Sequence, residues 1–381
     1  MEVNPTAGVL GVYAGFVTLG LVRGTVKLSV NLLLDLAKLS ALGLAMSFMC
    51  CAQFLTLMVL AGSGFCLYRN LPSPHLPAAG KAVFITGCDR GLGHQLAVVL
   101  DSLGMYVFAG CLFPGGEGEA SLKSKCSKRL CTVPLDVSDP ENIKEAAALV
   151  KKELKERELW GVVNNAGILY AGCLEVMTDS DIKRMIDVNL MGQLHTIRAF
   201  LPLLRASRGR LVNIASNTGL APVPLSATYC ASKAGVAILS ESLRLELKPW
   251  GISVSTIIPS GYRTGILLYD RKLVGDRWWE AASEEVKESY GQECFYLENI
   301  KKDYVSMLNA DFSGIVQEMV HALLEKSPKA FYYKGFLARS LPFLYQHLPT
   351  SVGDLIMPSL TWWYKFDPPA LRKQAPSHKG D

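Results

Sequence analysis

Between residues 81 and about 330, short apolar runs rich in β-branched residues alternate with longer amphipathic stretches. The longest amphipathic stretch, residues 141–157, has apolar positions at helical spacing. Strands that alternate with helices predict βαβ units, and strands as apolar as these fit a sheet that is covered on both faces. We therefore expect an α/β fold with a doubly wound parallel sheet. The predicted strands are residues 82–87, 106–111, 131–136, 161–167, 210–216 and 253–259.

The pattern before this region is different, because long stretches carry no charge at all. Residues 39–68 form a run of thirty uncharged residues between Lys38 and Arg69. A membrane-spanning helix needs about 20 apolar residues, so this run predicts a transmembrane helix. Residues 3–22 are also uncharged, but Asn4, Pro5 and several glycines dilute them. They are either a second span or a signal-anchor, since no basic segment of a cleaved signal peptide precedes them.

These patterns divide the chain into four parts. Residues 1–70 form a membrane anchor of one or two helices, and residues 71–80 form a Pro-rich linker. Residues 81–330 form the α/β domain. Residues 331–381 are a hydrophobic, aromatic extension with no uncharged run long enough to span a membrane. This extension could contact membrane lipid, border a substrate entry, form the contact of a homodimer, or pack on the domain.

The side of the membrane that the domain faces depends on the number of spans. The segment 23–38 carries three basic residues against one acidic residue, Asp35. If both uncharged runs span, the positive-inside rule places this segment in the cytoplasm and the α/β domain in the lumen. If the second run alone spans, the flanking charges do not discriminate between the two sides.

Composition excludes several classes of function. The net charge is +5, but the basic residues are dispersed and form no stripe, so we expect no nucleic-acid partner. The ten cysteines include no C-x-x-C pair, which argues against a cysteine zinc site or a thioredoxin motif. A disulfide framework is not expected in a chain of 381 residues, and a reducing compartment is the default for the domain.

The first predicted strand runs directly into the sequence TGCDRGLG, with glycines at positions 87, 91 and 93, and a helix-like stretch follows at residues 94–104. Glycines allow the backbone to approach a pyrophosphate, and the N-terminus of the helix offers free N–H groups and partial positive charge. This context predicts a dinucleotide site at Gly87, Gly91 and Gly93, with an ordinary tight turn as the alternative.

Polar residues also follow later strands, at the edge where ligands collect in parallel sheets. Asp136 could accept a hydrogen bond from an adenine amino group or could cap the next helix. The sequence NNAG, residues 164–167, ends the fourth strand, and Ser216 ends the fifth. Asn189 lies inside a probable helix, where asparagine is a poor helix former and requires a reason.

Tyr229 and Lys233 are four residues apart in a probable helix, so their side chains project from the same face. The pair could be ordinary helix surface. Alternatively, an ammonium group beside a phenol favours the phenolate and lowers its pKa from about 10. The tyrosine would then be a better general acid and base near neutral pH.

Taken together, TGCDRGLG, NNAG, Asn189, Ser216 and the Tyr229–Lys233 pair resemble, in this order, the short-chain dehydrogenase/reductase family over about 250 residues. Within it, sequences such as LWGVVNNAGIL and LELKPWGISVS resemble the membrane-anchored branch of hydroxysteroid, retinol and 3-hydroxybutyrate dehydrogenases. The hydrophobic N-terminus suits the 17β- and 11β-hydroxysteroid types best. The resemblance implies a Rossmann-like sheet and a nicotinamide cofactor.

The resemblance also implies roles for single residues. Tyr229 would be the general base in oxidation and the general acid in reduction. Lys233 would tune Tyr229 and hold the ribose hydroxyls of the nicotinamide. Ser216 would bind the substrate oxygen, and Asn189 would hold a water that links Lys233 to solvent. No metal is required. The implied cofactor-binding residues are Gly87, Arg90, Gly91, Leu92, Gly93, Asp136, Asn165, Ala166, Gly167, Tyr229, Lys233, Pro259 and Thr264.

The choice between NAD and NADP stays open. No carboxylate follows the second strand before Glu117, so the acidic residue that normally selects NAD is missing. In the wider family a basic residue at the position of Arg90 often contacts the 2′-phosphate of NADP, whereas the branch named above mostly uses NAD. The family usually has glycine where this chain has Ser260, which puts the geometry of that loop in question.

These observations predict a membrane-anchored dehydrogenase that transfers hydride between a nicotinamide and a hydrophobic secondary alcohol or ketone. A steroid is the first choice of substrate, then retinol, then 3-hydroxybutyrate. The alternative from a different functional class is a non-catalytic scaffold protein that binds NAD(P). We expect the substrate pocket at residues 221–228 and 265–304, including Trp278 and Trp279. The expected location is the endoplasmic reticulum membrane, with a mitochondrial membrane as the alternative.

Overall fold

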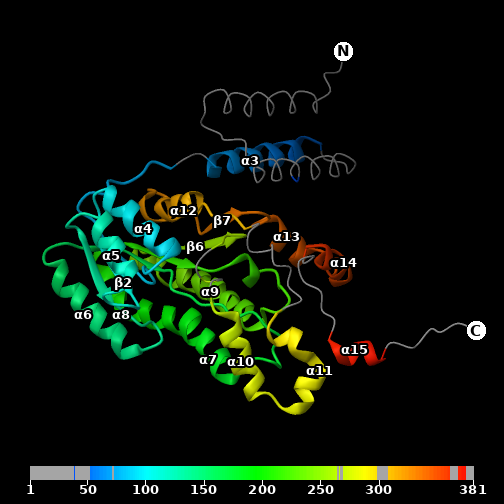
Figure 1. Cartoon of the computed structure of the whole chain (residues 1–381). Coiled ribbons are helices and arrows are strands. Elements are labelled where there is room, and N and C mark those ends of the chain that lie inside the picture. Colours follow the sequence, from blue (N-terminus) through cyan, green and yellow to red (C-terminus); the bar gives the residue numbers. More distant parts are fainter. Residues whose placement is uncertain are drawn as a thin grey trace, which may run out of the picture. The chain divides into compact units, whose positions relative to one another are not determined.

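The structure is a computed structural model of the whole chain (Figure 1). It describes Lys38 and residues 52–70, 73–263, 266, 269–297, 308–360 and 368–374. The chain divides into two compact units, residues 1–74 and residues 75–381. The division therefore falls within the Pro-rich segment 71–80.

In the first unit the structure describes helix α3 (Ala52–Asn70), which belongs to the second uncharged run. None of the described helices is both long enough and apolar enough to cross a membrane. Residues 3–22 and 39–51 lie outside the described part of the chain. The membrane anchor therefore stays a prediction.

The described residues of the second unit contain a parallel sheet of seven strands in the order β3-β2-β1-β4-β5-β6-β7 (Figure 1). The expected doubly wound parallel sheet is confirmed, and the strand order reverses direction between β1 and β4. The strands are β1 (Ala82–Ile85), β2 (Tyr106–Cys111), β3 (Leu130–Pro134), β4 (Leu159–Asn164), β5 (Arg210–Ile214), β6 (Ser253–Ser260) and β7 (Phe331–Gly335).

Strand β7 begins just after residue 330, so the sheet extends past the end that the sequence predicts for the domain. It pairs with β6 from Thr256 to Ser260. Its sequence, FYYKG, is aromatic rather than β-branched and stands at the start of an aromatic extension. This is why the pattern of strands did not reveal it.

Helices cover both faces of the sheet (Figure 1). On one face α4, α5 and α12 pack on strand residues such as Val83 and Ile85. On the other face α6, α8 and α9 pack on residues such as Ala82 and Phe84, and Phe84 stacks on Phe200 with ring centroids 4.2 Å apart. Alternate residues of β1 thus serve opposite cores, as a doubly covered strand requires. The bounds are α4 (Gly91–Ser102), α5 (Glu117–Lys125), α6 (Pro140–Leu154), α8 (Gly192–Ser207), α9 (Ala227–Glu246) and α12 (Ser313–Leu324).

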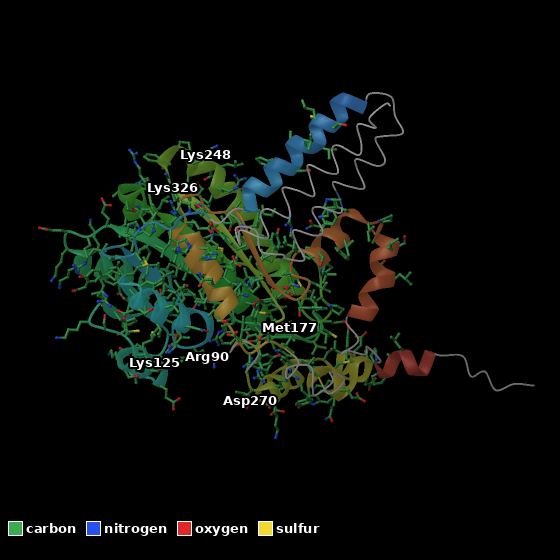
Figure 2. All side chains as sticks on the ribbon, turned by 90° about the horizontal axis from the view of Figure 1, so that it is seen from above. Arg90, Lys125, Met177, Lys248, Asp270 and Lys326 are labelled. Atoms are coloured by element: carbon green, nitrogen blue, oxygen red, sulfur yellow. The ribbon has the colours of Figure 1, made fainter. Side chains whose placement is uncertain are left out.

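A separate hydrophobic cluster, here called the lobe, lies beyond the sheet. It is formed by α7 (Asp179–Ile186), α10 (Arg271–Ala281), α11 (Glu284–Phe295) and the segment between β4 and α7. Its buried members are Val176, Met177, Met185, Val274, Trp278 and Phe295, and Met177 is marked in Figure 2. Three further helices, α13 (Ser340–His347), α14 (Thr350–Leu360) and α15 (Pro369–Gln374), follow β7.

The side chain of Asp181, on α7, links this helix of the lobe to α10. Its carboxylate has 4% exposure and accepts hydrogen bonds from the Trp278 indole at 2.8 Å and from Arg277 at 2.7 Å. A buried indole N–H needs such a partner, and a buried carboxylate needs a charge to pair with.

Replacing Asp181 should therefore destabilise the protein strongly. We expect Asp181→Ala to lower the free energy of unfolding by about 3 kcal/mol, because the buried Trp278 indole loses its acceptor and the exposed Arg277 loses its partner. Glu141→Gln is the control, since the exposed pair of Glu141 with Lys144 contributes little. Urea unfolding measures both variants, and equal small losses would contradict this account of the lobe.

Candidate functional site

The glycine-rich turn predicted from the sequence lies between β1 and α4, beside the position where the strand order reverses. Gly87 has φ +72°, and a side chain at Gly93 would place its Cβ 2.5 Å from the carbonyl oxygen of Gly87. Helix α4 begins at Gly91, and Arg90, its N-cap residue, makes no side-chain cap hydrogen bond. The turn thus presents bare backbone at a helix N-terminus, the arrangement that suits a pyrophosphate.

A network of hydrogen bonds joins this turn to the loop after β4. The Thr86 hydroxyl accepts from the backbone N–H groups of Asn165 at 3.0 Å and Ala166 at 2.9 Å. The Asn165 amide in turn donates to the carbonyl oxygens of Thr86 at 2.9 Å and Gly87 at 3.0 Å. These hydrogen bonds therefore join the TGCDRGLG and NNAG segments into one rigid unit at the edge of the sheet. The sequence singled out Asn165 but missed Thr86, whose only signal was its place at the start of the glycine motif.

Asn189 lies in a short π-helix, Asp187–Met191, between α7 and α8. Its side chain is fully buried, and Oδ1 accepts from the Ile168 N–H at 2.8 Å. Nδ2 donates to the Ile168 carbonyl at 2.9 Å and to the Ser232 hydroxyl at 3.1 Å. Asn189 thus ties the loop after Gly167 to helix α9, which explains an asparagine inside a helix. Such π-helical turns occur frequently at functional sites.

The predicted catalytic residues come together at the carboxyl end of β5 and the first turns of α9. Ser216 caps the short 3₁₀ turn Asn217–Gly219 and accepts hydrogen bonds from the N–H and hydroxyl of Thr218 at 3.2 Å and 2.9 Å. The Ser216 side chain lies close enough to the Tyr229 hydroxyl to lower the pKa of that phenol. The ammonium nitrogen of Lys233 lies 5.8 Å from the centroid of the Tyr229 ring.

Lys233 has 2% exposure, and its ammonium donates to the Ile214 carbonyl at 2.9 Å. A Cβ placed on Gly167 would be 3.5 Å from this ammonium and 3.2 Å from Asn189 Oδ1. Gly167, Asn189 and Lys233 therefore border one another. The backbone partner Ile214 and the hydroxyl of Ser232 were not predicted, because neither carries a motif of its own.

Burial dominates the pKa values of the pair. Burial lowers the pKa of the Lys233 ammonium to about 8. Burial also raises the pKa of the Tyr229 phenol well above its usual value, and the hydrogen bond with Ser216 offsets part of this rise. The sequence predicts a lowered pKa for Tyr229, because the Lys233 ammonium and a positively charged nicotinamide would both favour the phenolate. In the protein by itself, loss of water around the phenol sets the direction of the shift in its pKa.

The other implied cofactor residues lie around the same edge, with one exception. Leu92 is buried in α4, and Arg90 is exposed at the start of that helix (Figure 2). Asp136 is exposed after β3 and accepts from the Ser138 N–H at 2.9 Å, whereas Asp139 caps α6. The alternative interpretation of Asp136 as a helix cap is therefore wrong. Thr264 lies outside the described residues.

Ser260, which replaces the glycine usual in the family, causes no break in the backbone. Pro259 and Ser260 are both part of β6, and the Ser260 hydroxyl donates to the Phe336 carbonyl at 2.7 Å. The positive φ, +71°, occurs one residue later at Gly261. Strand β6 thus continues through Ser260, and the turn that follows has a glycine.

The predicted substrate pocket coincides in part with the lobe. Tyr229 packs against this cluster, together with Ile168, Tyr170 and Tyr269. Trp279 is partly buried, edge-on to Phe295 at 5.0 Å. Trp278 has 1% exposure and is bound to Asp181, so it supports the lobe from inside and forms no open wall. Residues 264, 265, 267, 268 and 298–307 lie outside the described part of the chain.

These residues fit a dinucleotide. Three features lie at the carboxyl ends of β1 and β4. They are a space at Gly93 that a Cβ would fill, the N-terminus of α4 without a side-chain cap, and the rigid NNAG loop. In open parallel sheets this is the crevice where ligands bind. The phenol, hydroxyl and ammonium of Tyr229, Ser216 and Lys233 stand at the neighbouring strand end, next to an apolar lobe.

Comparison with known proteins agrees with this geometry. The family model for short chain dehydrogenase matches residues 81–272. The chain is 38% identical to human 17-beta-hydroxysteroid dehydrogenase type 2 over 316 residues, which is 80% of each protein. It is 41% identical to rat retinol dehydrogenase 7 over 283 residues (73% of this chain, 87% of that protein). It is 38% identical to rat mitochondrial D-beta-hydroxybutyrate dehydrogenase over 300 residues (76% and 87%).

A crystal structure of a short-chain dehydrogenase from Streptomyces avermitilis shares the fold. Its TM-score is 0.56, with 23% identity over 74% of this chain and 97% of that one. The family model and the curated relatives confirm the resemblance, the CH–OH chemistry and the NAD(P) cofactor that the sequence predicts. The chain therefore belongs to the short-chain dehydrogenase family and is an oxidoreductase that acts on CH–OH groups with NAD or NADP.

Proposed function

We propose that this protein interconverts a steroid secondary alcohol and its ketone, in the manner of a 17β-hydroxysteroid dehydrogenase. The observation that carries the proposal is the position of Tyr229. Its hydroxyl lies beside the Ser216 side chain, which lowers the pKa of the phenol, while its ring packs on an apolar lobe that contains Tyr170 and Tyr269. The groups proposed for acid–base chemistry thus lie beside an apolar surface, which suits a lipophilic substrate.

The proposed mechanism assigns the proton to Tyr229. When bound, the nicotinamide supplies the acceptor or donor of the hydride. Ser216 would hold the substrate oxygen beside Tyr229, and the Tyr229 hydroxyl would take the alcohol proton in oxidation and return it to the ketone in reduction. The buried ammonium of Lys233 would stabilise the phenolate when it forms.

Asn189 would connect this pair to solvent through a water. Both hydrogens of its Nδ2 are used by Ile168 and Ser232, and Oδ1 already accepts one hydrogen bond. The second lone pair of Oδ1 and the backbone of the π-helical turn remain for such a water. Asn189 would therefore both hold the loop after Gly167 against helix α9 and position a water through which the proton passes.

We also propose that residues 1–70 anchor the protein in the endoplasmic reticulum membrane, with a mitochondrial membrane as the alternative. The support is the pair of uncharged runs at 3–22 and 39–68. The extension after β7 exposes large apolar side chains, with Phe336 76% and Leu355 78% exposed. Such side chains favour contact with membrane lipid, and a homodimer contact is their alternative use.

The substrate is best identified with microsomes that contain the full chain. Estradiol, testosterone, a corticosteroid, retinol and 3-hydroxybutyrate would each be offered with NAD and with NADP, beside Tyr229→Phe microsomes. We expect Tyr229-dependent turnover of a steroid. Turnover of retinol or 3-hydroxybutyrate alone would replace the steroid proposal. Bound cofactor without any turnover would favour the non-catalytic scaffold.

Arg90 gives a prediction about cofactor choice. If its exposed guanidinium at the start of α4 contacts a 2′-phosphate, Arg90→Ala should raise the KM for NADP about 10- to 100-fold, the contribution of one charge-assisted hydrogen bond. The KM for NAD should not change. Arg198→Ala, which removes an exposed arginine from α8, is the control. Equal effects on both cofactors, or none on either, would remove Arg90 from the phosphate site.

A further inference from the structure

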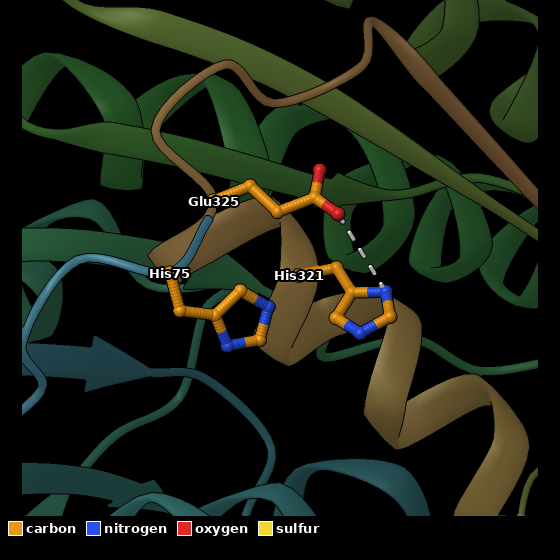
Figure 3. A group of neighbouring side chains, drawn as sticks. All are labelled: His75, His321 and Glu325. Atoms are coloured by element: carbon orange, nitrogen blue, oxygen red, sulfur yellow. Dashed lines mark ion pairs between the residues drawn. The ribbon is translucent and has the colours of Figure 1, made fainter. Parts of the chain in front are cut away.

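Two histidines and a glutamate meet in the second compact unit, residues 75–381, here called the catalytic unit, apart from the site described above. His75 is the first residue of that unit, His321 lies on the last turn of α12, and Glu325 follows this helix (Figure 3). One potential metal-ligand atom from each of the three lies within 4.8 Å of the other two. Figure 3 shows the two imidazoles and the carboxylate directed toward one another.

The backbone holds these residues in register. His75 and Glu325 form an isolated antiparallel β-bridge, and the N–H of Leu76 donates to the Leu324 carbonyl at 2.6 Å. The rings of His75 and His321 meet edge to face, with centroids 5.2 Å apart. His321 and Glu325 are also neighbours on one helical face, with Nδ1 and Oε1 3.9 Å apart. His75 and Glu325, 250 positions apart in the sequence, are thus brought together by main-chain pairing.

The surroundings orient the donor groups as a metal site requires. Glu325 is 6% exposed, and its Oε2 accepts a hydrogen bond from the Tyr332 hydroxyl at 2.9 Å. That bond leaves Oε1 on the side of His321. The Gln317 amide lies 2.9 Å from His321 Nε2. The contacting atom is the amide nitrogen, which donates to Nε2 and leaves the proton of a neutral ring on Nδ1. A metal ion on Nδ1 would displace that proton, and a half-turn of the Gln317 amide would let its oxygen accept the Nε2 proton, the pattern usual for metal-bound histidines.

The local charges are compatible with a cation. Glu318 Oε2 lies 3.7 Å from His321 Nδ1, which adds a second carboxylate beside the group, although Lys334 pairs with the other oxygen of Glu318 at 3.4 Å. Arg210 also contacts Glu325, but its guanidinium donates to the backbone oxygen at 3.4 Å and not to the carboxylate. The guanidinium itself is held over the Trp160 ring.

We propose that His75, His321 and Glu325 bind a divalent transition metal, with Zn²⁺ as the fitting ion. Two imidazoles and one carboxylate are an established donor set for zinc, whereas Ca²⁺ and Mg²⁺ prefer oxygen ligands alone. Tetrahedral zinc with bonds of about 2.0–2.1 Å needs ligand atoms about 3.3 Å apart, so the donors must move closer. His75 is exposed and His321 is partly exposed, so both rings are free to rotate toward the buried carboxylate.

The metal would join the point where the chain enters the catalytic unit to the end of α12. Helix α12 packs on the sheet and is followed by β7, the edge strand. A bound ion would therefore stabilise this edge of the unit. It has no part in the reaction at Tyr229.

The test is a zinc titration of the full-length protein in detergent, after removal of metal with a chelator, in competition with a chromophoric chelator. We expect one equivalent of Zn²⁺ to bind. His75→Gln and His321→Gln should weaken binding at least about 10- to 100-fold, as loss of even an outer-shell partner does. His347→Gln, which changes an exposed histidine on α13, should bind as the unchanged protein does. Zinc at about 100 times its Kd should raise Tm by about 5 °C in the unchanged protein and not in His75→Gln.

Co²⁺ is a second probe, because it distinguishes nitrogen and oxygen ligands from thiolates. We expect visible bands of tetrahedral Co²⁺ that are lost in both histidine variants. Equal zinc affinity in the unchanged protein and the histidine variants would overturn the proposal. Failure of the unchanged protein to bind zinc would also overturn it, and so would intense thiolate-to-cobalt bands, which would assign the ion to cysteines. The histidine variants carry the test because His75 is exposed, whereas Glu325→Gln also disturbs the buried contact with Tyr332.

Discussion

Replacement of Tyr229 by phenylalanine is expected to lower kcat about 100- to 10,000-fold, the usual contribution of a positioned general acid or base. The ring keeps its packing against the lobe, since phenylalanine has the same shape without the hydroxyl. Cofactor affinity and thermal stability should therefore change little. The measurement is kcat for the best substrate of the panel, together with binding of the reduced cofactor followed by its fluorescence.

Tyr106→Phe is the matched control. Tyr106 begins β2, at the opposite ends of the strands from the candidate site, and its ring contacts Arg157. Removal of its hydroxyl should leave kcat unchanged. If Tyr229→Phe keeps most of its activity, the proton must be moved by another group, and Ser216 would be the next residue to replace. If both tyrosine variants lose activity alike, the loss reflects folding and not chemistry.

Replacement of Lys233 by methionine should have two effects of opposite sign. Activity should fall at least about 100-fold, because the phenolate of Tyr229 loses the ammonium beside it. Stability at pH 7 should rise by about 2 kcal/mol. Burial that lowers the pKa of Lys233 to about 8 costs about 3 kcal/mol while the lysine is charged, and the lost hydrogen bond to Ile214 returns about 1 kcal/mol of this.

The pH dependence of this stability difference has a definite sign. Below pH 8 Lys233 is protonated in both the folded and the unfolded chain, so the cost of its burial is present in full. Between about pH 8 and 10.5 the unfolded chain binds more protons than the folded one, so the stability of the unchanged protein rises with pH. The advantage of Lys233→Met should therefore be largest below pH 8 and shrink toward pH 10.5.

Urea unfolding of both proteins at several pH values measures this difference. Lys183→Met is the control, since Lys183 is exposed and paired with Asp187 at the surface. A Lys233→Met protein that is less stable at pH 7 would mean that the ammonium is not a buried liability. A pH-independent difference would mean that the gain comes from packing alone. Either result would contradict the prediction that the buried ammonium of Lys233 lowers the stability of the fold.

The sheet and most of the site were predictable, because their signals are local. Apolar runs of β-branched residues gave six of the seven strands among the described residues, and the glycine motif gave the turn before α4. The spacing of Tyr229 and Lys233 placed both on α9. Strand β7 was missed, because its aromatic sequence has neither alternation nor β-branched residues to mark it.

The remaining features depend on partners that lie far apart in the chain. The hydrogen bonds from Asn165 and Ala166 to Thr86 cross about 80 positions, and no periodicity reports them. The π-helical turn at Asn189 exists because its amide bonds Ile168 and Ser232, which lie on different elements. The rise in the pKa of Tyr229 follows from burial, which a sequence does not display.

The packing of Tyr229 on the lobe has a consequence for how this enzyme can diversify. The sheet has its own cores on its two faces, whereas the lobe is a separate cluster held by Asp181. Stability within one protein is divided among such cooperative units. Substitutions in the lobe that spare Asp181 can therefore reshape the surroundings of the Tyr229 hydroxyl at little cost to the free energy of unfolding of the sheet. Substrate preference can drift in this way on an unchanged scaffold, at the expense of local order alone.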